Sequence, residues 1–258
     1  MPNIDQPDWV GLVRNRTMPI DRPAILQTWH DLVFLHARMP VGVLQAMVPR
    51  ELTVEQFDGS AWLGVVPFHM SRIRHPYFPA VPWLSEFPET NVRTYVTHPV
   101  LGPGVWFLSL DAARYLACWY ARKVFNLPYF HACQASEQDG DVWHYEGHRQ
   151  ARQALPSLAC STANLQEYSI TVRKTENWHV AEPGTFEFWL VERYRLYSMD
   201  LDNRIFSACV FHTPYEITCA EPETVRIVGL HEQFGPLDFS SVLMAKTLNV
   251  QCFSPKPV

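Results

Sequence analysis

The sequence lacks the short motifs that identify the common nucleotide-dependent and hydrolytic enzymes. It contains no G-x-G-x-x-G and no G-K-[ST] stretch, and neither a G-x-S-x-G nor an H-E-x-x-H pattern occurs. These absences remove the usual dinucleotide, nucleoside triphosphate, serine hydrolase and zinc protease interpretations. We therefore predict a protein that works without a cofactor.

Long apolar runs and basic clusters are also missing. No apolar stretch is long enough to span a bilayer, and the N-terminal M-P-N-I-D-Q-P-D-W lacks the basic and apolar regions of a secretion signal. The formal net charge is -5, and the lysines and arginines are scattered, whereas nucleic-acid binding requires a clustered basic surface. We expect a soluble, cytoplasmic protein with no nucleic-acid or membrane partner.

The sequence offers little for binding a metal. Its cysteines include no C-x-x-C pair, so they are interpreted as buried free thiols and not as zinc ligands or a redox pair. The pattern H-x-E-x-H places His144, Glu146 and His148 on one face of a strand. Because Gly147 interrupts that strand and a solvated hairpin face has the same pattern, we predict no metal site, and these three residues stay an open alternative. The six cysteines are Cys118, Cys133, Cys160, Cys209, Cys219 and Cys252.

Composition and strand patterning favour a β-rich α+β fold. With 47% hydrophobic residues in 258, the chain is long enough to bury a large core. Roughly ten segments have the pattern of strands, among them a long one at 24–39, and the helices are few and short. We expect a curved or barrel-closed antiparallel sheet, with 1–22 as an arm laid on the surface or frayed and 23–258 as one domain.

One strand carries an unusual set of polar side chains. In E-T-N-V-R-T-Y-V, alternation places Glu89, Asn91, Arg93 and Tyr95 on one face. A carboxylate, an amide, a guanidinium and a phenol in register are suited to fixing a small anionic or carbonyl ligand. The alternative is a Glu89–Arg93 ion pair buried in the interior.

A helix is expected at 112–125, after a cap at Asp111, and Asn126 and Pro128 end it. Its apolar spacing predicts a buried stripe, and the strand that follows delivers Tyr129, His131 and Cys133 to one face. The stripe is Leu116, Trp119, Tyr120 and Val124.

The segment at 72–88 is rich in proline and aromatic residues and is predicted to be a stiff loop. Two interpretations are open for it. The loop is either a lid or mouth over a pocket, or a packed Ω-like loop or oligomer contact.

These motifs resemble known families. The run R-K-V-F-N-L-P-Y-F from Arg122 resembles the acetoacetate decarboxylase motif, in which an Arg precedes a Pro-Lys-Lys. The segments E-x-N-V-R-T-Y-V, F-D-G-S-A-W-L-G-V-V-P-F, L-P-Y and V-E-R-Y-R-L-Y are similar to the YqjF-like family, also called DUF2071. The resemblance covers roughly 23–220 and implies an acetoacetate decarboxylase-like fold.

The chain departs from the decarboxylase at the position of its lysine pair. Tyr129 and Phe130 stand where the resemblance places the lysines, one of which forms a Schiff base with the substrate. A phenol cannot form an imine, and Lys123 is expected to reach solvent from the helix before Pro128. Decarboxylation through a Schiff base is therefore not expected.

Two functions remain open. The first is an enzyme acting on a small oxo-acid or other enolisable carbonyl compound, with Glu89, Tyr129 and His131 as its catalytic residues. The second is a binding or structural protein that kept the pocket without catalysis. In both, the ligand is a carboxylate or carbonyl compound, and a homo-oligomer stays open. The predicted ligand-binding residues are Asn91, Arg93, Tyr95, Arg122, Arg193 and His212, the last two from motifs that the resemblance picks out.

We predict that borohydride added in the presence of acetoacetate leaves no covalent adduct on this protein, because the imine-forming lysine is absent. Intact-mass spectrometry measures the outcome, with an authentic acetoacetate decarboxylase treated in parallel as the positive control. A trapped adduct on any lysine contradicts the prediction.

Overall fold

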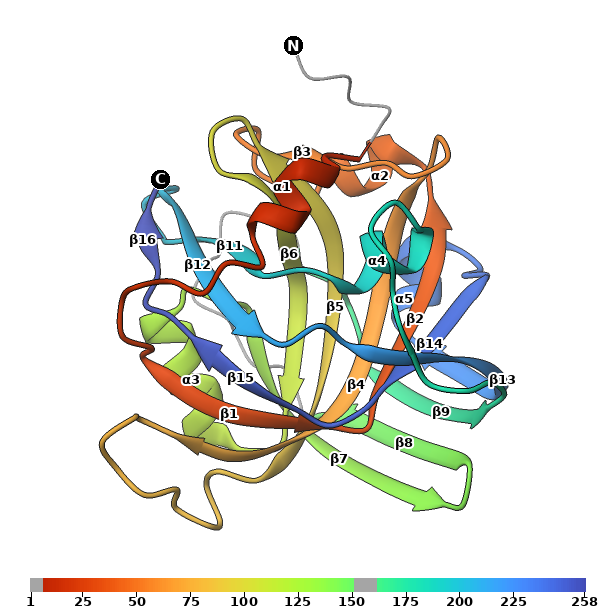
Figure 1. Cartoon of the computed structure of the whole chain (residues 1–258). Coiled ribbons are helices and arrows are strands. Elements are labelled where there is room, and N and C mark those ends of the chain that lie inside the picture. Colours follow the sequence, from red (N-terminus) through yellow and green to blue (C-terminus); the bar gives the residue numbers. More distant parts are fainter. Residues whose placement is uncertain (1–6, 151–161) are drawn as a thin grey trace.

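Paired strands make up most of the structure, and the few helices are short and lie around the strands (Figure 1). The computed structural model describes residues 7–150 and 162–258. The strands are β1 (Ile25–His30), β2 (Leu32–Met39), β3 (Thr53–Val54), β4 (Ala61–Arg74), β5 (Phe87–His98), β6 (Gly102–Ala112), β7 (Tyr129–Asp139), β8 (Val142–Arg149), β9 (Glu167–Lys174), β10 (His179–Val180), β11 (Arg195–Met199), β12 (Ile205–His212), β13 (Glu216–Val228), β14 (Ser241–Ala245), β15 (Leu248–Cys252) and β16 (Lys256–Pro257). The helices are α1 (Trp9–Arg14), α2 (Val41–Gln45), α3 (Tyr115–Val124), α4 (Phe186–Val191) and α5 (Leu230–Phe234).

The strand pairings close two rings that share β4, β5 and β6. The first ring runs through β1, β15, β12, β11, β6, β5 and β4 and returns to β1. The second runs through β6, β7, β8, β9, β13, β14, β2, β4 and β5. The curved, largely antiparallel sheet predicted from the sequence is confirmed. Two pairs are parallel, β6 with β11 and β6 with β7, and α3 supplies the crossover that the second of these requires.

Alternation along β5 divides its side chains between the two rings. Val92 and Val96 belong to a buried cluster with Tyr145 and Ile170 of the second ring. On the other face, Glu89 and its polar neighbours point into the first ring, whose apolar cluster includes residues of β4, β6, α4 and β15. One strand therefore carries both a core face and a polar interior face.

The strand expected at 24–39 is interrupted at one residue. Asp31 has φ of 52°, a left-handed conformation that Asp tolerates better than most residues, and it separates β1 from β2. The interruption lets β1 pair with β15 in the first ring while β2 pairs with β14 in the second. The turn thus carries the chain from one ring to the other.

The predicted orientation of the helix after β6 is wrong. The stripe expected to be buried, Leu116, Trp119, Tyr120 and Val124, is 39% to 52% exposed, and Cys118 on the opposite side is fully buried. Asp111 does not cap α3, because it lies within β6 and pairs with Arg149 at 2.7 Å. An apolar stripe at helical spacing marks a core face only when the helix packs on a core, whereas here Leu116, Trp119 and Tyr120 border an opening.

The N-terminal arm contains a helix that the sequence pattern did not indicate. In α1, Leu12 is 1% exposed, and the Asp8 carboxylate accepts a hydrogen bond from the Gly11 amide at 2.8 Å. Trp9–Arg14 of the expected arm is therefore not frayed but forms a short helix on the surface, with Leu12 buried and Val10 78% exposed. Residues 1–6 of that arm lie outside the described residues.

Of the cysteines expected to be buried, Cys118 is buried and Cys133 is exposed, while the other described ones are partly buried. Cys160 and most of the neighbouring loop lie outside the described residues. None of the helices in the described part of the chain is long and apolar enough to cross a membrane.

We predict that Gly104→Ala destabilises the protein by about 1–3 kcal/mol, since the added methyl group would clash with a buried ring and with the backbone of a neighbouring strand. A Cβ at this position would lie 2.7 Å from the Tyr197 ring and 2.9 Å from the Arg195 carbonyl oxygen. Urea unfolding measures the free energy of unfolding. Gly42→Ala is the control, because a Cβ there meets no atom within 4 Å. Equal stabilities of the two variants would contradict the packing argument.

Candidate functional site

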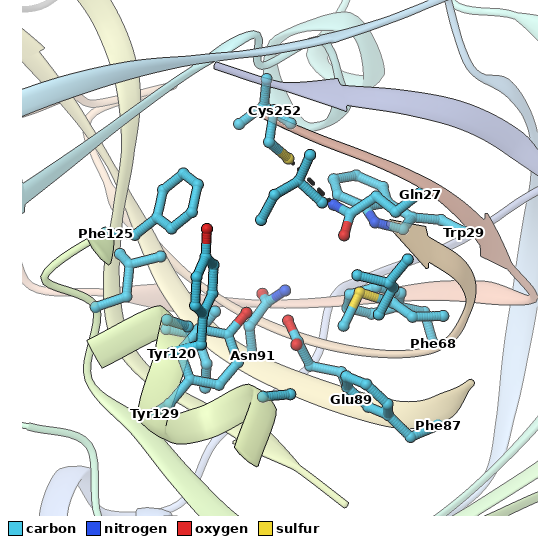
Figure 2. Close-up of a pocket in the computed structure, with 18 of the residues that line it drawn as sticks. Gln27, Trp29, Phe68, Phe87, Glu89, Asn91, Tyr120, Phe125, Tyr129 and Cys252 are labelled. Atoms are coloured by element: carbon cyan, nitrogen blue, oxygen red, sulfur yellow. Dashed lines mark hydrogen bonds between the residues drawn. The ribbon is translucent and has the colours of Figure 1, made fainter. Parts of the chain in front are cut away.

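A cavity of about 580 Å³ lies inside the first ring (Figure 2). Strands β1, β2, β4, β5, β6, β7, β11, β12 and β15 contribute residues to its walls. Helix α3 and the loop between β4 and β5 border it on one side, where the loop lies beside the helix (Figure 1). A volume of roughly 300–1,000 Å³ is typical of sites for small organic ligands.

Glu89 is the acidic group of the cavity. Its residue is 3% exposed, and its Oε2 atom has no hydrogen-bond partner among the described residues. Burial raises the pKa of this carboxyl to about 8, the nearby Asp111 carboxylate adds to the rise, and a hydrogen bond with Tyr129 opposes it. At neutral pH, Glu89 is therefore mostly a neutral carboxylic acid, and its ionised form is a stronger base than an ordinary carboxylate.

Tyr129 directs its hydroxyl group towards Glu89 from the first residue of β7 (Figure 2). Its place is fixed by its own backbone carbonyl, which accepts a hydrogen bond from Arg122 Nε at 2.7 Å. Burial, followed by the charge of Glu89, raises the pKa of this phenol well above its usual value. Tyr129 therefore stays protonated and is a hydrogen-bond donor throughout the neutral range.

Three arginines line a different part of the cavity, and each has a nitrogen without a partner among the described residues. Arg193 donates from Nη1 to Glu55 at 2.6 Å and from Nε to the Trp189 carbonyl oxygen at 2.7 Å, while its Nη2 is unpartnered. Arg195 donates from Nη1 to a serine hydroxyl, and its Nε is unpartnered. Arg93 Nε is unpartnered too. Among the described residues, only one of these three guanidinium groups is paired with a carboxylate, Arg193 with Glu55, so this part of the cavity is suited to an anion.

The acid and the arginines lie at opposite ends of the cavity. Glu89 and Arg93 are four residues apart on β5, about 13 Å along a strand. The Arg93 guanidinium turns away from Glu89, because its Nη2 lies 3.4 Å from the Tyr95 hydroxyl, beyond it on the strand. Because the guanidinium turns away, the alternative of a Glu89–Arg93 ion pair is not found among the described residues. Arg93 and Arg193 instead act on His36: their charges help to lower the pKa of its imidazole, although burial is the larger cause.

The structure brings five of the nine predicted site residues to the cavity wall, namely Glu89, Asn91, Arg93, Tyr129 and Arg193. The Asn91 Oδ1 atom is buried and has no partner among the described residues, and its side chain lies beside Glu89 and Tyr129 (Figure 2). These five come from β5, β7 and the turn before β11. The polar interior face predicted for β5 is therefore where the cavity has its functional groups.

The other four predicted residues lie behind the wall. Tyr95 is fully buried, and its hydroxyl lies 2.6 Å from His36 Nε2. Arg122 holds the backbone of Tyr129, as described above. His131 is half-buried and meets the Tyr115 ring edge-on. His212 stacks on a tyrosine ring, and its Nε2 lies 3.4 Å from the Arg193 carbonyl oxygen, so it supports that arginine from outside the cavity.

Several wall residues are absent from the predicted site. The sequence could have indicated Arg195, since the alternation in V-E-R-Y-R-L-Y places it on the same face as the predicted site residue Arg193. No local sequence pattern indicated that Gln27, Trp29 and Cys252 would line the cavity. They are brought to it only by the pairing of β1 with β15 and β4. Gln27 Nε2 lies 3.2 Å from Cys252 Sγ (Figure 2).

No described group of three His, Cys, Asp or Glu side chains is arranged to hold a metal ion. His144, Glu146 and His148 are exposed on β8, where His144 Nδ1 lies 2.9 Å from the Thr171 hydroxyl. The cavity groups described above offer proton transfer and hydrogen bonding beside an anion site.

Comparison with known proteins gives a family match and a set of structural neighbours. The model of DUF2071, described as an uncharacterized conserved protein, matches residues 26–248. The uncharacterized protein YqjF of Bacillus subtilis (strain 168) is 34% identical over 221 residues, which cover 86% of this chain and 81% of that protein.

Two solved structures share the fold. An acetoacetate decarboxylase-like enzyme from Sphingomonas wittichii RW1 has a TM-score of 0.65 at 12% identity, covering 92% of this chain and 94% of that one. The enduracididine biosynthesis enzyme MppR, solved with pyruvate, has a TM-score of 0.62 at 10% identity, covering 92% and 91%. The predicted acetoacetate decarboxylase-like fold is confirmed, and at these identities the likeness extends to the fold alone.

We predict that Glu89→Gln becomes increasingly stable relative to the wild type as the pH rises from 5 to 8. The pKa of this carboxyl is about 8 in the folded state and 4.5 ordinarily, so between these values the folded wild type holds one proton more and loses stability as the pH rises. The difference should grow by an amount on the order of 1–3 kcal/mol.

Urea unfolding at pH 5 and pH 8 measures this difference. The matched control is Glu137→Gln, because that side chain is exposed on β7. A stability difference that is the same at both pH values would show that Glu89 is not desolvated in the folded protein.

Proposed function

The chain belongs to the DUF2071 family and has an acetoacetate decarboxylase-like fold, and from this premise we propose that it is an enzyme that moves a proton on an enolisable carbonyl compound bearing a carboxylate. The observation that carries the proposal is the buried Glu89 carboxyl beside the Tyr129 phenol, with a pKa of about 8 for the former. A base whose pKa lies near the working pH is well matched to proton transfer from carbon.

A covalent lysine has no part in the proposed reaction. All four lysines of the chain lie among the described residues, and none of them lines the cavity. Lys123 is exposed on α3, and the other three contact acidic side chains elsewhere on the molecule. Catalysis therefore depends on proton transfer and on the electrostatic environment of the cavity.

The proposed step uses the two groups in complementary roles. The ionised fraction of Glu89 removes a proton from the carbon next to the carbonyl group, and the electron pair of that C–H bond moves onto the carbonyl oxygen. Tyr129, which stays protonated, donates a hydrogen bond to this oxygen as negative charge develops. Glu89 then returns the proton to the oxygen or to a carbon, so the net reaction is an isomerisation that needs no other reactant. A carboxylate base with a tyrosine oxyanion donor is an established combination for such chemistry.

The end of the cavity that holds the arginines is the proposed binding site for the carboxylate of the substrate. Arg93, Arg193 and Arg195 present unpartnered nitrogens among the described residues, and guanidinium groups bind carboxylates with charge-assisted hydrogen bonds. The structural neighbour MppR has been solved with pyruvate, an oxo-acid, which supports a ligand of this chemistry in the shared fold.

We predict that the protein exchanges the protons next to the carbonyl group of such a compound with deuterium from D₂O. The rate should rise with pH and level off above about pH 8, following ionisation of Glu89. Glu89→Gln should lower it by roughly 10²–10⁴-fold, and Tyr129→Phe by roughly 10–10³-fold. Proton NMR of a panel of oxo-acids measures the exchange.

Glu137→Gln, remote from the cavity, is the control and should exchange at the wild-type rate. Equal rates for the wild type and Glu89→Gln would exclude the proposed role of the carboxyl. Binding of an oxo-acid without exchange would instead support a ligand-binding protein that lacks catalysis.

A further inference from the structure

The separation of the two functional ends sets the length of the ligand. The Cα atoms of Glu89 and Arg93 are about 13 Å apart along β5, and an extended chain covers about 3.8 Å with every three bonds, so this separation corresponds to roughly ten bonds. A three- or four-carbon oxo-acid contacts one end only. The Arg93 guanidinium does not shorten this separation, because it is directed away from Glu89, with its Nη2 3.4 Å from the Tyr95 hydroxyl.

The wall between the two ends is mostly apolar, and Asn91, midway between Glu89 and Arg93 on β5, is its polar group. The other side chains of this wall come from several strands and from the segment before β7, and most of them are hydrocarbon or aromatic. Such a wall favours a hydrocarbon chain, whose burial contributes about 0.8 kcal/mol for each CH₂ group. The wall residues include Trp29, Val66, Phe68, Leu110, Phe125 and Leu127.

The opening of the cavity is apolar as well. Phe78 and Val81 from the loop before β5, and Leu116, Trp119 and Tyr120 from α3, both line the cavity and remain exposed. Helix α3 packs beside β7 here, with Cys118 Sγ 3.4 Å from the carbonyl oxygen of Phe130, the residue after Tyr129. This rim adjoins the end that carries Glu89, so apolar surface continues past the reacting groups towards solvent.

We infer that the substrate is an amphipathic oxo-acid whose carbonyl group is remote from its carboxylate, separated by a hydrocarbon chain of roughly ten bonds. The carboxylate binds at Arg93, Arg193 and Arg195, the chain lies along the apolar wall, and the carbonyl group lies between Glu89 and Tyr129. The inference deepens the proposed function, since it names the substrate class of the same site.

A series of twelve-carbon oxo-acids with the carbonyl at carbon 2, 6 or 10 tests the inference on the wild-type protein. Isothermal titration calorimetry measures binding, and deuterium exchange measures the reaction. All three acids should bind, and exchange should be fastest for the 10-oxo acid, because its carbonyl group reaches Glu89. Shorter saturated acids should bind about fourfold more weakly for each CH₂ removed.

Arg93→Met and Arg195→Met should each weaken binding of the twelve-carbon acids about tenfold or more, because each removes a charge-assisted contact. Arg195→Met keeps the test informative if the buried Arg93 variant fails to fold. The control Glu137→Gln should bind as the wild type does.

The outcomes separate this inference from the proposed function. Fastest exchange of a short 2-oxo acid, dependent on Glu89, would overturn the inference and leave the proposed function in place. Tight, arginine-dependent binding of the long acids with no exchange of any would overturn the proposed function and retain the ligand class. Absence of binding at millimolar concentration would overturn the inference.

Discussion

The structure depends on the alternation of side chains along β5, a strand that belongs to two closed rings at once. Val92 and Val96 pack into the core of the second ring, so their neighbours on the strand must point into the first. A one-residue slip would put polar groups into the core and apolar groups into the cavity, and packing of the second ring opposes it. The positions of Glu89, Asn91 and Arg93 are therefore held by an apolar core that none of them touches.

Burial of Glu89 works against stability at neutral pH. The pKa of about 8 means that the folded protein either binds a proton from solvent or keeps a poorly solvated carboxylate, and both are less favourable than an exposed glutamate. The rest of the ring compensates with apolar packing, including the buried Trp62 and Trp189. A buried carboxyl that lowers stability in this way is typical of functional sites, where the same desolvation makes its ionised form a stronger base.

Local sequence patterns were sufficient for the polar face but not for the way in which the rings close. Alternation in E-T-N-V-R identified Glu89, Asn91 and Arg93, and the proline before Tyr129 indicated a fixed strand start. Trp29 and Cys252 reach the same cavity through pairings between strands more than two hundred residues apart, which no local pattern encodes. The stripe on α3 was assigned to the core because an apolar rim around an opening has the same helical spacing as a buried face.

The cavity has to bind a carboxylate with its arginines and also keep the pKa of Glu89 high, and these two requirements conflict if the arginines lie close to Glu89. Two unit charges 4 Å apart interact by about 4 kcal/mol at an effective dielectric constant of 20, roughly three pKa units. An arginine that close to Glu89 would therefore cancel most of the rise in its pKa from 4.5 to about 8. At a separation of about 13 Å, which is that of the two Cα atoms along β5, the same interaction is about 1.3 kcal/mol, or roughly one pKa unit. A cavity that must both bind a carboxylate and keep a basic glutamate has to hold the two apart, and a four-residue spacing on one strand does so.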